Sequence, residues 1–256
     1  NSALKLTKKD AAGNLTPSIM ALGEARNVTH AKDILSLLML QAGTPITSLV
    51  GSEWRSQLNQ NFGLPTLPAQ SAFEFYTQFS NPTKTFYSWN RSLVDAQTHF
   101  TSGQSAYYIG YASELPLLRS KNPTLNLAVT SVPQSRVSGK TISFGRLRAI
   151  AIARGAANPE GALALATKLV SSSAVNSLSK VLGLPPARRD LLSAKPADPN
   201  LAIFYDASLQ SRAWVDPDAK LSRNIFNEAI ESITSGRART SEALNKANSE
   251  LNELLK

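Results

Sequence analysis

The chain has 256 residues, a formal net charge of +9 and no cysteine. This length allows one large domain or two small ones, and the missing cysteines exclude disulfides and thiolate metal sites. Because His30 and His99 are its only histidines, a histidine-based zinc site is not expected either. We therefore expect no metal and no cofactor. The positive charge is compatible with an ordinary basic surface or with an anionic partner, but no basic patch interleaved with aromatic residues accompanies it, so no nucleic-acid partner is expected.

Apolar spacing and turn signals predict the elements of the first half of the chain. Residues 29–41 are apolar nearly all round, which predicts a deeply buried helix, with Thr29 as its cap and Gly43 as its end. A capping box from Ser92 to Asp95 predicts another helix. The expected elements are a strand at 16–22, helices at 29–41, 68–79 and 92–101, and a loop-rich stretch at 44–67.

The second half alternates short strands and helices before ending in helices. Asn158-Pro159, Asp198-Pro199 and Asp216-Pro217 each place a cap before a proline, which predicts helix starts. The expected strands are 105–109, 126–132 and 141–153, and the expected helices are 113–120, 159–169, 174–182, one from 198, one from 216 to a stop at 236, and one from 240. The balance predicts an α/β protein that is rich in helix, with a small mixed sheet.

Tyr111 directly follows Gly110, where a predicted strand ends and a helix begins. In α/β proteins ligands bind at this edge. A tyrosine there offers a flat apolar face and a hydroxyl, which suits a sugar ring. Ligand contact and plain packing both remain open for this side chain.

Motifs that carry catalysis are missing. The sequence contains no G-x-S-x-G elbow, no Walker loop and no G-x-G-x-x-G. Ser177 and Lys180 match S-x-x-K but lie in an amphipathic helix without partner motifs, so a helix surface is the favoured interpretation. Carboxylates form no obvious pair, although a glycosidase pair could still meet from distant positions. The chain is interpreted as a binder rather than an enzyme.

Several segments resemble one family in its order. The pattern from Phe100 through Gly103 and Ala106 to Gly110 resembles the "F-x-x-G-x-x-A-M-x-x-G" segment of extracellular solute-binding proteins of ABC importers, in the sugar-binding, maltose-binding-protein-like branch. Other segments also match the family and stand in the same order along the chain. They are the buried helix ending at Gly43, the stretch from Phe144 to Pro159, residues 182–186 and the pair of segments around 235–244. Nothing corresponds to the family's long N-terminal α/β segment, so we expect a fragment that lacks most of the N-terminal lobe.

The resemblance implies a type II periplasmic-binding-protein-like lobe. Residues 1–140 and 184–256 would form the C-terminal lobe, and 141–183 would cross back to the other lobe. It also implies an extracytoplasmic protein that binds a saccharide in an interlobe cleft and docks on a membrane permease. A carbohydrate-active enzyme or a module that binds cell wall or another anionic polymer is the alternative.

The resemblance also suggests ligand contacts, with Tyr111 at the position of a stacking aromatic. Asn27, Trp214 and Arg223 lie near segments that supply cleft residues, although a structural role is the favoured interpretation for these three. Arg146, beside Gly145, leads to the hypothesis of an acidic ligand.

Overall fold

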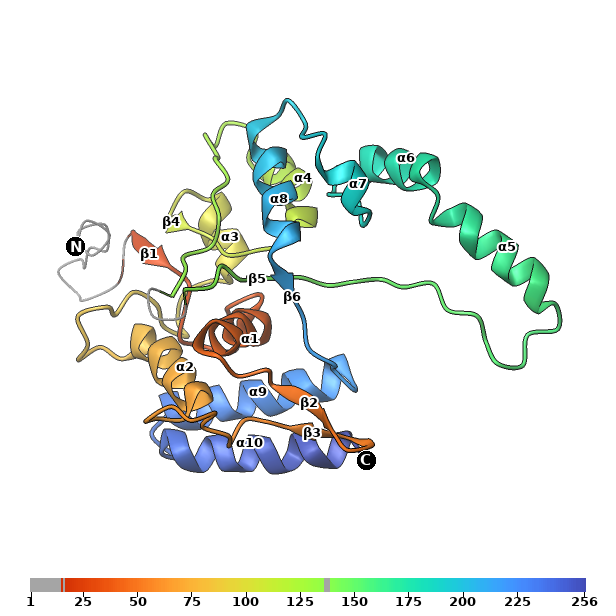
Figure 1. Cartoon of the computed structure of the whole chain (residues 1–256). Helices are drawn as coiled ribbons and strands as arrows, with labels where there is room; N and C mark the ends of the chain where they lie inside the picture. The colour runs from red at the N-terminus through yellow and green to blue at the C-terminus, as the bar shows by residue number, and fades with distance from the viewer. Residues whose placement is uncertain (1–14, 16, 136–138) are drawn as a thin grey trace.

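The computed structural model describes residues 15, 17–135 and 139–256, and Figure 1 shows the chain from red to blue. Its helices are α1 (Ala31–Ala42), α2 (Pro68–Thr77), α3 (Ala96–Thr101), α4 (Leu115–Lys121), α5 (Pro159–Leu169), α6 (Ser172–Leu182), α7 (Arg189–Leu192), α8 (Pro199–Leu209), α9 (Ala219–Thr234) and α10 (Thr240–Leu254). Two 3₁₀ turns, η2 (Gln78–Ser80) and η3 (Ala112–Glu114), and the strands β1 (Ser18–Met20), β2 (Thr47–Val50), β3 (Glu53–Ser56), β4 (Ser105–Tyr107), β5 (Ser143–Phe144) and β6 (Ser211–Arg212) complete it.

A layer of helices holds the core. Helix α1 lies at the centre of the body, with α2, α9 and α10 packed below it in Figure 1. Their apolar faces meet around fully buried side chains such as Leu35, Phe73, Phe226 and Leu244. Burial of an aliphatic or aromatic side chain of this size contributes about 1.5–3 kcal/mol. This layer therefore fixes α1, whose first turn faces the candidate site.

The strands form three pairs, among the described residues, rather than one sheet. β1 pairs with β4 in parallel, β2 pairs with β3 as an antiparallel hairpin, and β5 pairs with β6 in parallel. The predicted class, a helix-rich α/β protein, is confirmed, and the small mixed sheet that was expected is divided into these parallel and antiparallel pairs. The strand expected over 126–132 is wrong, because these residues form no ladder with any other part of the described chain. Of 141–153, only Ser143 and Phe144 form a strand.

Several predicted helix starts move by a few residues because another side chain provides the cap. Asp95, not Ser92, caps α3 by accepting a hydrogen bond from the Thr98 backbone N–H at 3.0 Å. Asp218, not Asp216, caps α9. His30 occupies the N-cap position of α1, where Thr29 was expected, but its side chain makes no cap hydrogen bond. The caps expected at Asn158 and Asp198 are confirmed. The loop expected at 44–67 contains the β2–β3 hairpin, and residue 16 of the first expected strand lies outside the described residues.

Residues from Gly145 to about Lys195 form an arm that extends away from the body, on the right of Figure 1. Helix α5 has no buried residue and α6 has only Ser179, so their apolar side chains face solvent. The most exposed large ones there include Leu163, Leu165, Leu178 and Val181. The chain rejoins the body at α8, whose first residues contact the 126–134 segment through the Val129 N–H and the Asn200 carboxamide.

Candidate functional site

The turn from Gly110 to Glu114 presents Tyr111 at the end of the segment that follows β4. The Glu114 carboxylate folds back and accepts a hydrogen bond from the Tyr111 backbone N–H at 2.7 Å. A Cβ on Gly110 would lie 2.5 Å from Glu114 Oε2 and 2.4 Å from the Tyr108 ring, so only glycine fits there. The Tyr108 hydroxyl and the Gln97 amide donate to the other carboxylate oxygen at 2.9 and 3.1 Å. Glu114 thus fixes the position of Tyr111.

His30 ties this turn to the first turn of α1. Its Nε2 lies 2.8 Å from Glu114 Oε2, and its ring meets the Tyr111 ring edge-on with the centroids 5.0 Å apart. Burial alone would raise the pKa of Glu114, but the hydrogen bonds from His30 and the Tyr111 N–H outweigh it and hold this pKa below its ordinary value. Glu114 therefore stays ionised and keeps its acceptor role.

Arg146 covers one face of Tyr111. Its guanidinium carbon lies 4.7 Å from the ring centroid, and its Nη2 donates to Asp33 Oδ2 at 2.5 Å. Burial and then the nearby Asp33 carboxylate raise the pKa of the Tyr111 hydroxyl, so this group remains protonated. Because Arg146 belongs to the arm and Asp33 to α1, this contact joins the root of the arm to the body.

Two hollows adjoin this cluster and share His30 and Asp33 as walls. The first, of about 220 Å³, lies between α1, the Gly110–Tyr111 turn and α8, and is mostly apolar. Hydroxyls and amides line part of it, from Thr130, Ser131, Gln134, Ser208 and Gln210. The second, of about 200 Å³, lies beside the start of α1 and is lined by Arg146, Arg223 and Asn227 among others. We call these the apolar hollow and the basic hollow.

A family model described as bacterial extracellular solute-binding protein matches residues 5–203. This chain belongs to that family. The match confirms the resemblance drawn from the sequence, and membership implies an extracytoplasmic location. None of the curated proteins compared matches the chain.

Solved structures of solute-binding proteins share the fold. A cyclo/maltodextrin-binding protein complexed with maltotetraose superposes with a TM-score of 0.70 at 16% identity, over 98% of this chain and 62% of that one. A solute-binding protein of an ABC transporter from Thermotoga lettingae, bound with alpha-D-tagatose, gives 0.59 at 18% identity, over 91% and 59%. The chain thus spans about three fifths of the length of these structures. Among the described residues, no helix is both long and apolar enough to span a bilayer.

Of the residues singled out in the sequence of this solute-binding protein, the structure brings together Tyr111, Arg146 and Arg223. Tyr111 lines the apolar hollow, Arg223 lines the basic hollow, and Arg146 lines the basic hollow while lying over the Tyr111 ring. Trp214 lies apart from both hollows: its indole N–H donates to Ser36 at 3.2 Å and its ring packs edge-on against Phe226.

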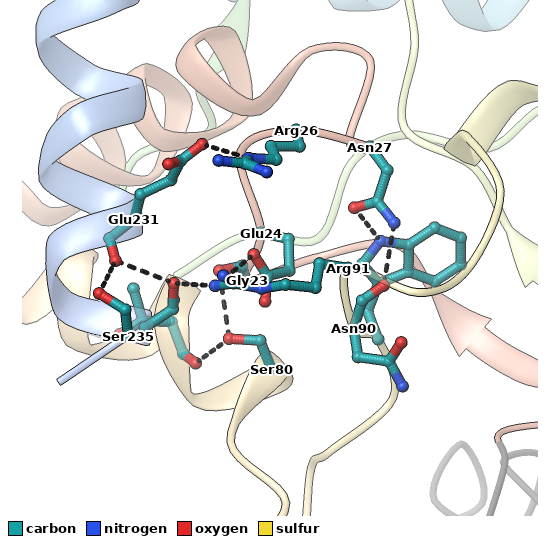
Figure 2. A network of polar contacts seen from close by, with 12 residues as sticks. Gly23, Glu24, Arg26, Asn27, Ser80, Asn90, Arg91, Glu231 and Ser235 are labelled. Atoms are coloured by element: carbon teal, nitrogen blue, oxygen red, sulfur yellow. Dashed lines mark hydrogen bonds and ion pairs between the residues drawn. The ribbon is translucent and has the colours of Figure 1, made fainter.

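The Asn27 side chain makes hydrogen bonds within the protein. Its amide donates to the carbonyls of Asn90 and Leu93, both at 2.9 Å, and its carbonyl oxygen accepts from the Trp89 indole at 2.9 Å. Figure 2 shows the Asn27 carboxamide pointing at Asn90 and at the Trp89 indole. The ion pair between Arg91 and Glu24 lies nearby. These contacts give Asn27 a structural role, which the sequence also favoured.

Sequence reasoning missed Glu114, His30 and Asp33 as parts of the site. His30 and Asp33 carried a usable signal, since they stand in the first turn of the helix that was expected to be the most buried. The sequence signal for Glu114 was weaker, because its partner His30 lies 84 residues away in the chain.

Proposed function

We propose that this chain is most of the C-terminal lobe of the substrate-binding component of an ABC importer, which holds a saccharide without chemical change. The observation that carries the proposal is the Tyr111 ring, held by Glu114 beside a hollow with apolar and hydroxyl-bearing walls, in a chain of the solute-binding family. Aromatic faces stack on sugar C–H surfaces while short polar side chains bond the hydroxyls. A permease in the membrane is the expected partner, and no cofactor is required.

The division into lobes follows the arm. In this proposal residues 1–140 and 184–256 belong to the C-terminal lobe, and 141–183 crosses to an N-terminal lobe; residues 1–14, 16 and 136–138 lie outside the described part. Support comes from the uncovered leucines of α5, because a monomeric protein rarely leaves such a large apolar surface in water. The longer chains of the solved relatives support it too.

Within this proposal Tyr111 supplies the stacking face, and Arg146 and Arg223 contact the ligand from the neighbouring basic hollow. Asn27 and Trp214, the other two residues proposed from the sequence, support the site indirectly. Asn27 holds the loop at 90–96 through its side-chain amide, and the Ala96 N–H donates to the Asn27 backbone carbonyl at 2.8 Å. Trp214 packs on α1 through Ser36 and lies near the Lys32 ammonium.

Isothermal titration of the full-length protein against a glycan panel tests the proposal. We expect at least one saccharide to bind, and the Tyr111→Ala variant to weaken that binding by about tenfold or more, as loss of one stacking ring of about 1.5 kcal/mol implies. Tyr107→Ala is the matched control, because Tyr107 is exposed on β4 and lines neither hollow. Equal losses in both variants would refute the role of Tyr111.

A hydrolysis assay on the glycan that binds separates the alternatives. Binding without product is expected for a transport component. Turnover that disappears when one aspartate or glutamate is replaced would instead establish a carbohydrate-active enzyme, and binding confined to cell-wall or other anionic polymers would establish a polymer-binding module.

A further inference from the structure

The basic hollow carries one positive charge that the protein itself does not compensate. Arg26 pairs with Glu231 at 3.1 Å, Lys32 with Asp216 at 2.5 Å, and Arg146 with Asp33 at 2.5 Å. Arg223 lines the same hollow and has no hydrogen-bond or ion-pair partner among residues 15, 17–135 and 139–256. An unpaired guanidinium in a concave surface favours an anion there.

Asn227 adds a neutral polar group to the same wall. It stands four residues after Arg223 on α9, so the two side chains lie on one face of the helix. Its carbonyl oxygen is buried and accepts no hydrogen bond within the described structure. A buried acceptor without a partner costs free energy. Because this oxygen is closed to solvent, a ligand hydroxyl reaches it when the Asn227 side chain turns into the hollow.

The basic hollow adjoins the proposed stacking site. His30 and Asp33 line both hollows, and Arg146 lines the basic hollow while lying 4.7 Å from the centroid of the Tyr111 ring. In the proposal that follows, a ligand that contacts Tyr111 extends one substituent past Arg146 toward Arg223. That substituent meets one net positive charge and one acceptor for a hydroxyl.

We propose that the ligand is an acidic saccharide, with one carboxylate, as in a uronic sugar, bound by Arg223 and a neighbouring hydroxyl bound by Asn227. The inference rests on the proposed function and names the substrate class of its site. Arg146 is not the selecting charge, because Asp33 already neutralises it. Arg146 instead closes the side of the hollow through its exposed guanidinium.

The test is isothermal titration of the full-length protein with trigalacturonate and galactotriose, paired probes that carry a carboxylate and a hydroxymethyl group, respectively, at C6 of each sugar, within a wider panel of uronic and neutral oligosaccharides. We expect the uronic members to bind at least tenfold more tightly than their neutral counterparts. Raising the ionic strength should weaken uronic binding and leave neutral binding unchanged.

Variants at Arg223 assign the effect to this side chain. Arg223→Gln is expected to weaken uronic binding about tenfold more than it weakens neutral binding, while Arg223→Lys, which keeps the charge, loses less of the uronic binding. Arg55→Gln is the control, since Arg55 is an exposed arginine of β3 outside both hollows. Because Arg223 is exposed and makes no ion pair in the described part, its variants should fold like the parent.

The outcomes separate the two proposals. Neutral saccharides that bind as tightly as uronic ones, or an Arg223→Gln variant that loses both equally, overturn the acidic ligand and leave the saccharide-binding function standing. If no member of the panel binds, the saccharide-binding function itself is overturned, and the acidic ligand with it.

Discussion

Replacing Glu114 should destabilise the protein far more than replacing an ordinary surface glutamate. Its carboxylate accepts four hydrogen bonds, from the Tyr111 N–H, His30, the Tyr108 hydroxyl and Gln97, over distances of 2.7–3.1 Å. Its side chain is only 15% exposed, so water can replace just part of them. At about 1 kcal/mol for each bond, with partial rescue by water, Glu114→Ala should lower the free energy of unfolding by about 3 kcal/mol.

Urea denaturation followed by circular dichroism measures this loss. The control is Glu53→Ala, because Glu53 is 68% exposed and makes only a surface pair with Arg55, so its removal should cost less than about 0.5 kcal/mol. Similar losses in the two variants would refute the assignment of Glu114 as the residue that holds the Tyr111 turn.

The contribution of Glu114 to the stability of the fold should decrease as the pH is lowered. Folding lowers the pKa of Glu114 below its ordinary value of 4.5, so the ionised form stabilises the fold above that value. This contribution is lost as the pH falls through the folded pKa. The stability gap between the parent and Glu114→Gln should therefore be full at neutral pH and shrink below about pH 4.5.

Three further changes test the packing around the site. Gly145→Ala should break the β5–β6 pair, because its Cβ would lie 1.8 Å from Ser211 Oγ; the Gly145 amide should lose protection from hydrogen exchange, whereas Gly155→Ala, with open space at its Cβ, should leave that amide protected. Asn27→Ala should cost about 2 kcal/mol in urea denaturation by removing three hydrogen bonds, and a change below about 0.5 kcal/mol would contradict its structural role. Leu165→Ser should change the free energy of unfolding of this chain by less than about 0.5 kcal/mol, because Leu165 is 59% exposed. In the full-length protein the same change should lower the melting temperature, because an N-terminal lobe would cover the arm. An unchanged melting temperature of the full-length protein would argue against that lobe.

Helices could be predicted well because their signals are local. The apolar spacing of α1, α2, α9 and α10 and the proline after Asn158 or Asp198 lie within a few residues of the feature they specify. The cap positions were less certain, since Asp95 and Ser92, or Asp218 and Asp216, compete at neighbouring positions.

Strands could be predicted poorly because a ladder needs a distant partner. Residues 126–132 alternate as a strand would, yet no neighbouring segment pairs with them. The β2–β3 hairpin was missed although Gly51 and Ser52 form a two-residue turn of the kind that signals a hairpin.

In the candidate site, the sequence pointed to Tyr111, because its place directly after a glycine can be recognised from neighbouring residues. The residues that surround Tyr111 could not be recognised in this way. Tyr111 follows a glycine at a strand exit, which is visible in the sequence. Asp33 and Arg146 are 113 residues apart, and nothing in the chain signals their contact. Pairings of this kind depend on how α1 and the root of the arm are placed by the core.

The short parallel pair β5–β6 has a mechanical consequence. The chain leaves the body at Gly145 directly beside the place where α8 returns it to Ser211, and only a few backbone hydrogen bonds, such as that from the Gly145 N–H to Arg212 at 3.0 Å, join the two segments. The other root of the arm is the start of α8, tied to the 126–134 segment through Val129 and Asn200, so the arm is held at two points of the body. Arg146 directly follows Gly145, so its contacts with Asp33 and the Tyr111 ring fasten the outgoing root beside the aromatic ring.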